Sequence, residues 1–392
     1  MGLLPLKGVT VVAIEQAVAA PFATRQLADL GARVIKIERP GSGDFARGYD
    51  TRAHGLASHF VWVNRSKESL TLDLKHPEAA PILQRLLQRA DVCVQNLAPG
   101  AAGRLGLDAQ TLRGRYPRLI VCQLTGYGTS GPYAHKKAYD LLVQAEAGML
   151  SITGSEDAPA KVGVSIADIA GGMYAYTGVL TALLVRAQTG QGSAFEISLF
   201  EALSEWMGYA MYYTMGGPQP SRSGASHAAI APYGPYPARD GLVLFGIQNE
   251  REWERFCGEV LERPELTRDA RFATNELRVA HHAELDAAIE QRFRQLSSAE
   301  VTARLDNAQI ANAHINSVRG LIDHPQLHAR DAWREVGSPV GPIPALLPPV
   351  RMAGVDARMD EIPAVGQHSE SILEELGFDR GRIAAWKGAG VI

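Results

Sequence analysis

One acidic residue, Asp168, has neighbours that suit covalent chemistry. It lies in the segment Val164-Ser-Ile-Ala-Asp-Ile-Ala-Gly-Gly-Met173, where almost every other residue is apolar or small. A carboxylate with little competing water around it can attack an acyl carbon. Gly171 and Gly172 would let another backbone or a bulky substrate come close. The plainer interpretation is that Asp168 caps the helix that follows it, and the segment by itself leaves both roles open.

Other motifs that could carry chemistry are weak or absent. Gly126-Tyr-Gly-Thr-Ser-Gly131 fits the pattern GxGxxG, but Pro132 and a polar stretch follow where a dinucleotide site needs a helix. The sequence contains no Walker A loop, no HExxH and no GxSxG. Three widely spaced cysteines and scattered histidines predict no metal site. We therefore expect no permanently bound cofactor or metal.

The elements that must position Asp168 alternate between strands and helices. Six runs of mostly apolar residues are expected to be strands buried on both faces of a parallel sheet: Val9–Glu15, Arg33–Glu38, Ser69–Leu74, Asp91–Asn96, Leu119–Thr125 and Ala194–Leu199. Helical segments lie between them, including Ala167–Gln188, which begins beside Asp168. This alternation predicts an α/β fold, a doubly wound, Rossmann-like parallel sheet with a smaller α+β domain.

Changes in composition predict the domain boundaries. The expected large domain comprises residues 1–205 together with 335–392, and the expected small domain comprises residues 225–330. A segment rich in glycine, proline and serine marks the first linker, at 206–224, and the second is placed at 331–334.

Charge and hydropathy exclude several classes of partner. The net charge of the 392 residues is −3 and no basic block occurs, which disfavours nucleic-acid binding. No secretory leader is recognised at the N-terminus, and no apolar run approaches the roughly 20 residues that span a bilayer. The expected location is the cytoplasm, without a membrane partner.

A series of short motifs resembles the class III CoA-transferase family, which includes formyl-CoA:oxalate and carnitine CoA-transferases and α-methylacyl-CoA racemases. Each motif is weak alone, but their order and intervals are specific. The chief ones are Ala20-Pro-Phe-Ala-Thr24, Leu27-Ala-Asp-Leu-Gly-Ala-Arg-Val-Ile-Lys-Ile-Glu-Arg-Pro40, Asn64-Arg-Ser-Lys67, Asn96-Leu-Ala-Pro-Gly100, Gly126-Tyr-Gly-Thr-Ser-Gly-Pro132, Gly190-Gln-Gly192 and Gly366-Gln-His-Ser369. The resemblance runs almost from end to end.

The resemblance implies a large domain built from both chain ends, and a homodimer of two interlocked ring-shaped subunits. It identifies Asp168 with the family's catalytic nucleophile, in the context D-x-x-x-G-M. It also implies that coenzyme A and acyl-CoA are substrates rather than bound cofactors, and that small carboxylic acids are the other partners.

The resemblance places CoA binding on eight positions. Arg39 should meet the phosphorylated adenosine, Leu72 and Asp73 should lie beside the adenine, and Tyr139 and Asp140 should lie near the pantetheine and the nucleophile. The full set is Arg39, Leu72, Asp73, Asn96, Arg104, Lys137, Tyr139 and Asp140. Ordinary roles as strand-end cap, turn residue or surface charge stay open for Asp73, Asn96, Arg104 and Lys137.

Two departures from the family pattern bear on the reaction. Val18 aligns with a glutamine of the formyl-CoA transferases, with Gln16 two places earlier, which disfavours a very small acid such as oxalate. Racemases carry Gly-His-Asp where this chain has Ala138-Tyr-Asp140, and proton abstraction beside a thioester needs a positioned base. The missing histidine favours CoA transfer, with an acyl-CoA racemase or epimerase as the alternative.

Two later segments, Ala225–Tyr236 and Ala308–Asn316, resemble the subgroup that acts on C4 and C5 dicarboxylates such as mesaconate, succinate, itaconate and malate. A second carboxylate on the substrate would need a cation or several donors. Arg47, Arg222 and His227 are the candidates.

Overall fold

The chain is described by a computed structural model that covers residues 2–392. It divides into two compact units. The first unit holds the residues up to Ala147 together with Gly163–Trp206 and His328–Ile392, and the second holds Gly148–Val162 and Met207–Leu327.

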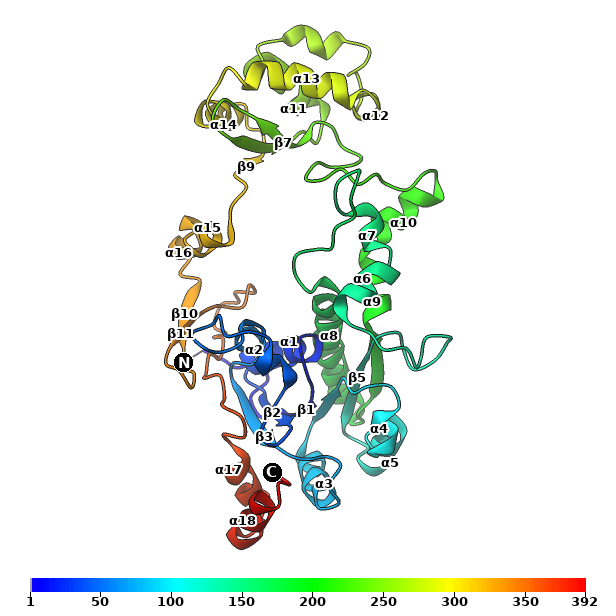
Figure 1. Cartoon of the computed structure of the whole chain (residues 1–392), viewed down its shortest axis with the longest axis vertical. Coiled ribbons are helices and arrows are strands. Elements are labelled where there is room, and N and C mark those ends of the chain that lie inside the picture. Colours follow the sequence, from blue (N-terminus) through cyan, green and yellow to red (C-terminus); the bar gives the residue numbers. More distant parts are fainter. Residues whose placement is uncertain (1) are drawn as a thin grey trace. The chain divides into compact units, whose positions relative to one another are not determined.

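A six-stranded parallel sheet forms the centre of the first unit (Figure 1). Its strand order, β3-β2-β1-β4-β5-β6, is that of the doubly wound nucleotide-binding fold, with the order reversing between β1 and β4. The strands are β1 Thr10–Ile14, β2 Arg33–Glu38, β3 Lys67–Thr71, β4 Val92–Gln95, β5 Ile120–Thr125 and β6 Ala194–Ser198. The predicted α/β class and all six expected strands are confirmed, with β3 beginning two residues earlier than expected.

Helices from both ends of the chain cover this sheet. One face is buried beneath α3, α5, α17 and α18, in a core that includes Leu70, Leu86 and Trp386. Helices α1 and α8 pack against each other and against the sheet. The helices of the unit are α1 Ala19–Asp29, α2 Ser58–Val63, α3 Ala79–Arg89, α4 Ala101–Arg104, α5 Ala109–Arg115, α6 Asp140–Glu146, α8 Ile166–Thr189, α9 Leu199–Trp206, α17 Ser369–Glu375 and α18 Arg380–Gly388, with the short 3-10 helix η1 at Phe45–Gly48.

The second unit is α+β, with its own aromatic-rich core around Trp253, Phe256 and Phe293. A three-stranded antiparallel sheet, in the order β7-β8-β9, is made of Tyr233–Pro237, Leu242–Gly246 and Asn312–Ala313. Its helical segments are α7 Met149–Ile152, α10 Gly208–Met215, α11 Glu250–Arg255, η2 Phe256–Val260, η3 Pro264–Arg268, α12 Asn275–Ala280, α13 His282–Phe293, α14 Ser298–Asn307 and α15 Val318–Ile322, with α16, Pro325–Ala329, at the boundary of the two units.

The structure differs from the expected linkers in two places. Within the segment 206–224, expected to be linker, residues 208–215 form helix α10. The expected second linker overlaps the start of β10, Trp333–Val336, which pairs with β11, Ile343–Leu346. Pro344 is tolerated in this two-stranded hairpin because each strand has a free edge. Residues Gly148–Val162, expected in the large domain, belong to the second unit.

Helix α8 differs from the expectation that no apolar run approaches the length of a membrane span. With 24 residues it is long and apolar enough, by length and composition alone, to cross a membrane. It carries Asp168 in its first turn and Arg186 in its last, and it packs against α1, α9 and β5. These contacts are those of a core helix of the α/β unit.

Candidate active site

Asp168 lies in the first turn of α8, but it does not cap the helix. It is the third helical residue, and Ser165 at the N-cap position makes no side-chain capping bond. The capping acceptor is Asp140, at the start of α6. Its Oδ1 accepts the backbone N–H of Ala167 at 2.8 Å and that of Asp168 at 3.3 Å. Asp140 therefore performs the capping role that the sequence left open for Asp168.

The Asp168 carboxylate is held without a partner. Within residues 2–392 it makes no hydrogen bond or ion pair through its side chain, although it is half-buried. Burial, and secondly the charge of Asp140, raise its pKa to about 7. A helix N-terminus would favour the carboxylate form, so burial and repulsion outweigh the helix here. The result is a basic, poorly solvated carboxylate, as a nucleophile requires.

Gly171 and Gly172 are explained by helix packing. A Cβ on Gly172 would lie 2.6 Å from the backbone oxygen of Ala19, and one on Gly171 would lie 2.4 Å from Cδ2 of Leu199. The two glycines thus let α8 pack closely on the start of α1 and on α9. The close approach of another backbone, one of the two expectations for this pair, is found at Gly172.

Three of the predicted CoA-binding residues present exposed cations. The side chains of Arg39, Arg104 and Lys137 are exposed, and none forms an ion pair or hydrogen bond with another described side chain. Arg39 follows the end of β2, and Arg104 ends α4 beyond β4. The carboxyl ends of parallel strands form the usual ligand edge of such a sheet. No described side chain therefore neutralises the positive charge of Arg39, Arg104 or Lys137.

Two other predicted CoA-binding residues are tied to the protein. Leu72 is only 2% exposed and belongs to the core, while its N–H donates to the Glu38 backbone oxygen. Asp73 accepts the Lys75 N–H at 3.0 Å through its side chain. Leu72 thus offers a ligand mainly its backbone.

Asn96 joins the two loops at the point where the strand order reverses. Its Oδ1 accepts the Gln16 N–H at 2.9 Å, and its Nδ2 donates to the Gln16 backbone oxygen at 2.8 Å. The loop after β1 is therefore fixed to the loop after β4. Val18, in the same loop, is 3% exposed, so its side chain packs inside the protein.

Arg47 has a different environment from the one expected. Its Nε and one terminal nitrogen donate to the two carboxylate oxygens of Glu38, at 2.8 and 2.7 Å. Its other terminal nitrogen donates to the Pro363 backbone oxygen, and the guanidinium lies 3.6 Å from the ring centroid of Phe60. This pairing favours a structural role for Arg47 over contact with a substrate carboxylate.

Arg222 and His227 belong to the second unit. The Arg222 guanidinium donates to the backbone oxygens of Ser155 and Glu156, at 2.9 and 2.7 Å, without a carboxylate partner in the described chain. His227 is exposed, stacks on Tyr233 and accepts the Ala229 N–H through Nδ1. Arg222 therefore keeps an unneutralised positive charge.

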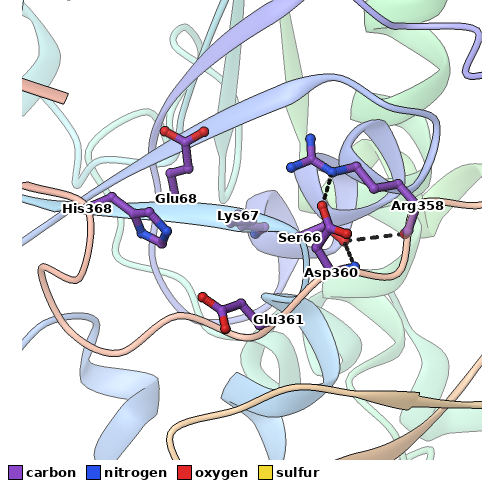
Figure 2. A pocket seen from close by; sticks show the side chains of 7 residues that line it. All are labelled: Ser66, Lys67, Glu68, Arg358, Asp360, Glu361 and His368. Carbon is purple, nitrogen blue, oxygen red and sulfur yellow. Dashed lines mark hydrogen bonds and ion pairs between the residues drawn. The ribbon is translucent and has the colours of Figure 1, made fainter. Parts of the chain in front are cut away.

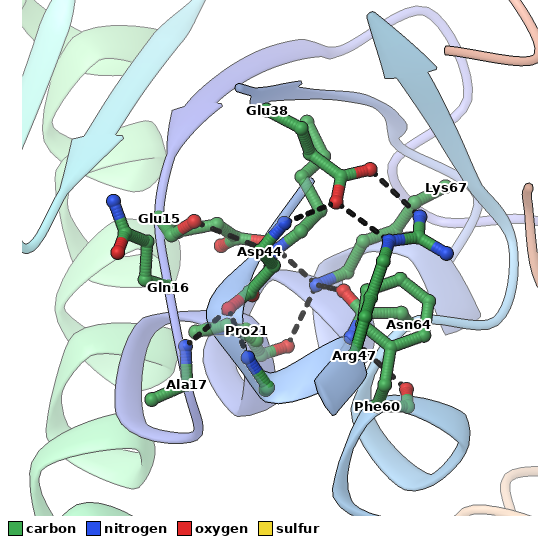
Figure 3. Close-up of polar contacts among 12 residues, drawn as sticks. Glu15, Gln16, Ala17, Pro21, Glu38, Asp44, Arg47, Phe60, Asn64 and Lys67 are labelled. Atoms are coloured by element: carbon green, nitrogen blue, oxygen red, sulfur yellow. Dashed lines mark hydrogen bonds and ion pairs between the residues drawn. The ribbon is translucent and has the colours of Figure 1, made fainter. Parts of the chain in front are cut away.

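Sequence reasoning missed a buried charge network at the carboxyl ends of β1 and β2 (Figure 3). Its members are Glu15, Lys36, Glu38, Asp44, Arg47 and Lys67. A signal was present, because Lys36 and Glu38 interrupt the apolar run of β2. Charged side chains within a buried strand require partners.

A separate polar cavity of about 410 Å³ lies between β3 and the segment that precedes α17 (Figure 2). It is lined by Ser66, Lys67, Glu68, Arg358, Asp360, Glu361 and His368. Its charges are largely paired, since Arg358 contacts Asp360 and Glu68 binds Arg33. None of the residues predicted for the active site lines this cavity.

Comparison with known proteins gives consistent matches over nearly the whole chain. Residues 6–369 match CoA-transferase family III. The chain is 34% identical over 401 residues to the succinyl-CoA:glutarate CoA-transferase of Mus musculus, covering 99% of this chain and 90% of that protein. It is 33% identical to the succinate–glutarate CoA-transferase of Agrobacterium fabrum, covering 95% and 96%. Among solved structures, a CAIB/BAIF family protein from Brucella suis matches with a TM-score of 0.83 and 34% identity, covering 96% of this chain and 100% of that one.

Proposed function

Because this chain belongs to CoA-transferase family III, we propose that it moves CoA between short dicarboxylic acids through a covalent thioester on Asp168. The candidate acids have four or five carbons: mesaconate, succinate, itaconate and malate from the sequence, and glutarate from the relatives. One observation carries the proposal. The Asp168 carboxylate is half-buried and unpartnered, while a second carboxylate, Asp140, satisfies the helix end beside it.

The reaction exchanges one activated carboxyl group for another. A carboxylate oxygen of Asp168 attacks the thioester carbonyl of the donor, and CoA leaves as a thiolate to give a mixed anhydride. The thiolate attacks the aspartyl carbonyl and releases the donor acid, which leaves an aspartyl-CoA thioester. The acceptor carboxylate attacks that thioester, and the thiolate then takes the acceptor acyl group and frees the Asp168 carboxylate. The overall reaction exchanges one thioester for another and changes the free energy little, and covalent catalysis divides it into separate acyl transfers.

The surroundings of Asp168 support this cycle in two ways. Its raised pKa reflects a carboxylate that is poorly solvated, and such a group is a stronger nucleophile than one in water. The same burial limits the water that would hydrolyse the anhydride.

Among the described residues, the segment that aligns with the base of the racemases, Ala138-Tyr-Asp140, supplies no histidine and no free carboxylate. Racemization needs a second group to exchange the α-proton. Asp140 is occupied, since its Oδ1 accepts two backbone N–H groups and its Oδ2 accepts Gln144 Nε2 at 2.7 Å. The neighbouring Tyr139 is an exposed phenol where racemases carry histidine. Both observations favour transfer.

The proposal includes a homodimer. Large apolar side chains on α10 are strongly exposed, among them Tyr212 and Met215, each 77% exposed. Apolar surface of this kind is typical of a protein interface. Light scattering of the purified protein at assay concentration should give twice the mass of one chain, and a monomer would remove this part of the proposal.

A panel assay tests the substrate class. The purified protein is incubated with succinyl-CoA and, in turn, with glutarate, mesaconate, itaconate, malate and the monocarboxylate acetate, and the CoA esters are identified by mass spectrometry. We expect transfer to at least one dicarboxylate and little to acetate. No transfer to any dicarboxylate would remove the proposal. Exchange of an α-hydrogen in deuterated water without an acceptor acid would support the racemase instead.

A further inference from the structure

The loop that connects β1 to α1, Glu15–Val18, is held in a strained shape. Ala17 has φ +63°, in the left-handed region that non-glycine residues rarely adopt. The N-cap residue of α1, Val18, supplies no side-chain bond to the helix. Strain of this kind persists only where surrounding contacts enforce it. Asn96 fixes Gln16 in this loop, and the strained Ala17 needs a contact of its own.

Asp44 is the side chain that holds Ala17. Its Oδ1 accepts the Ala17 N–H at 3.1 Å and also the N–H of Ala46, at 2.9 Å, in the short helix η1 (Figure 3). One carboxylate oxygen thus joins the loop after β1 to the loop after β2. We call this contact the Asp44 clamp.

Lys36 fixes the other side of Asp44. Its Nζ donates to Oδ2 at 2.8 Å, and it lies 3.5 Å from Oε1 of Glu15. Glu15 in turn accepts Lys67 Nζ at 2.6 Å. The side chains of these two lysines and two carboxylates are fully buried.

Stability alone does not explain this arrangement. Desolvation of buried ion pairs offsets most of their attraction, and replacing them with apolar residues is often neutral or stabilising. In some proteins, however, a balanced set of buried charges specifies one geometry for the groups that it holds.

The clamp lies close to the proposed nucleophile. Gly172, one turn after Asp168, packs against the backbone oxygen of Ala19 at the start of α1. Tyr49, which follows η1, lies near enough to both Asp44 and Asp168 that their charges, after burial, help to raise its pKa. A movement of Asp44 and Ala17 would therefore be transmitted to Asp168 through the contact of α1 with Gly172 and through Tyr49.

We infer that Asp44, whose charge Lys36 balances, is a positioning residue of the transfer reaction: its Oδ1 holds the Gln16–Val18 loop in the shape that places the acyl group against Asp168. The inference rests on the proposed function for its chemical consequence. The clamp itself is a property of the fold.

Two double variants isolate the clamp. K36M/D44N removes both charges but keeps an oxygen that can accept the Ala17 N–H, whereas K36M/D44L removes the same charges and that oxygen. Both leave the Glu15–Lys67 pair in place. We expect K36M/D44N to stay within about 3-fold of the wild-type kcat. We expect K36M/D44L to lose up to about 10²-fold in kcat, with the KM for succinyl-CoA within about 3-fold, since small misplacements have effects of this size.

Hydrogen–deuterium exchange of the peptide containing Ala17 provides a readout that needs no turnover. We expect fast exchange in K36M/D44L and protection in K36M/D44N and in the wild type. Equal exchange in the two double variants would overturn the clamp. Unequal exchange with equal kcat would overturn its positioning role.

If the wild type transfers CoA to no acid, the proposed function fails, and the positioning role of Asp44 fails with it. The exchange experiment still tests the contact between Asp44 and Ala17 in that case. If K36M/D44L does not fold, K36M/D44A, which also lacks the accepting oxygen, takes its place.

Discussion

The carboxylates of the buried charge network and the half-buried carboxylate of Asp168 have opposite surroundings. In the buried charge network every carboxylate has a cation. Burial would raise the pKa of Glu15, but Lys67 and Lys36 outweigh it and the pKa is lowered. Likewise Arg47 and Lys36 overcome burial at Glu38 and lower its pKa to about 2. At the start of α8, Asp168 has no cation, and its pKa rises to about 7.

This difference separates structural carboxylates from a reactive one. A paired carboxylate is stable as an anion and holds backbone in place, as Asp44 holds Ala17. An unpaired, half-buried one is poorly stabilised and gains by forming a covalent bond. Hence burial alone does not distinguish Asp168 from the carboxylates of the network, whereas the lack of a cation within residues 2–392 does.

The largest expected effect is on turnover when Asp168 is changed. D168N removes the nucleophile with little change in shape, so transfer from succinyl-CoA should fall by about 10³-fold or more. The matched control is D108N, because Asp108 only caps α5 and asparagine caps equally well. The CoA esters formed per minute are measured by mass spectrometry. A D168N enzyme within tenfold of the wild type would erase the distinction between the two groups of carboxylates.

Unbalancing the network should mainly affect stability. K36M leaves surplus negative charge buried around Asp44 and Glu15, which costs about 3–5 kcal/mol of unfolding free energy. K36M/D44N restores the balance and should recover most of that loss. Urea unfolding followed by circular dichroism measures both. If the single and double variants are equally stable, the network is not a balanced set of charges.

The pH dependence of kcat/KM should report the raised pKa of Asp168. Because attack needs the carboxylate form, kcat/KM should rise about tenfold per unit below pH 7 and level off above it. D140N keeps an acceptor for the helix N–H groups but removes a neighbouring charge, so its profile should move to lower pH. The fall in the Asp168 pKa in D140N should be much smaller than the rise from its ordinary value to about 7, because burial is the larger cause of that rise. Identical profiles for D140N and the wild type would exclude the influence of Asp140.

The smallest expected effect is a gain in stability from D168N. A carboxyl whose folded-state pKa is raised to about 7 binds more protons in the folded than in the unfolded state between about pH 4 and 7. The stability that it contributes therefore falls as pH rises through that range. D168N lacks this loss and should exceed the wild type by about 2 kcal/mol at pH 8, with little difference at pH 4. Urea unfolding at both values tests this, and an equal difference at both would contradict it.

The sequence predicted the sheet well because its strands are continuous apolar runs, as in Val11-Val-Ala-Ile14. The beginning of β3 was missed because Lys67 and Glu68 do not look like buried strand residues. Lys67 can be buried because Glu15, 52 residues earlier, pairs with it and the Pro21 and Asn64 oxygens accept its other N–H groups. Such a contact is a property of the folded chain and has no local signature.

The same limit applies to the candidate site. The apolar surroundings of Asp168 are local and could be read directly. Its freedom from the capping role depends on Asp140, which comes from another helix 28 residues earlier. The pairing of Arg47 with Glu38 likewise depends on how the chain turns after β2. Residue types therefore pointed to Asp168 as the candidate nucleophile, while its unpaired state and the pairing of Arg47 with Glu38 could be seen only in the fold.

The most direct test is to trap the covalent intermediate. The protein is mixed with succinyl-CoA, quenched, digested and analysed by mass spectrometry, with hydroxylamine added to a parallel sample. The account predicts a CoA thioester on the peptide that contains Asp168, which hydroxylamine converts to a hydroxamate and which D168N lacks. Transfer of CoA with no adduct on that peptide, or with an adduct on another residue, would contradict it.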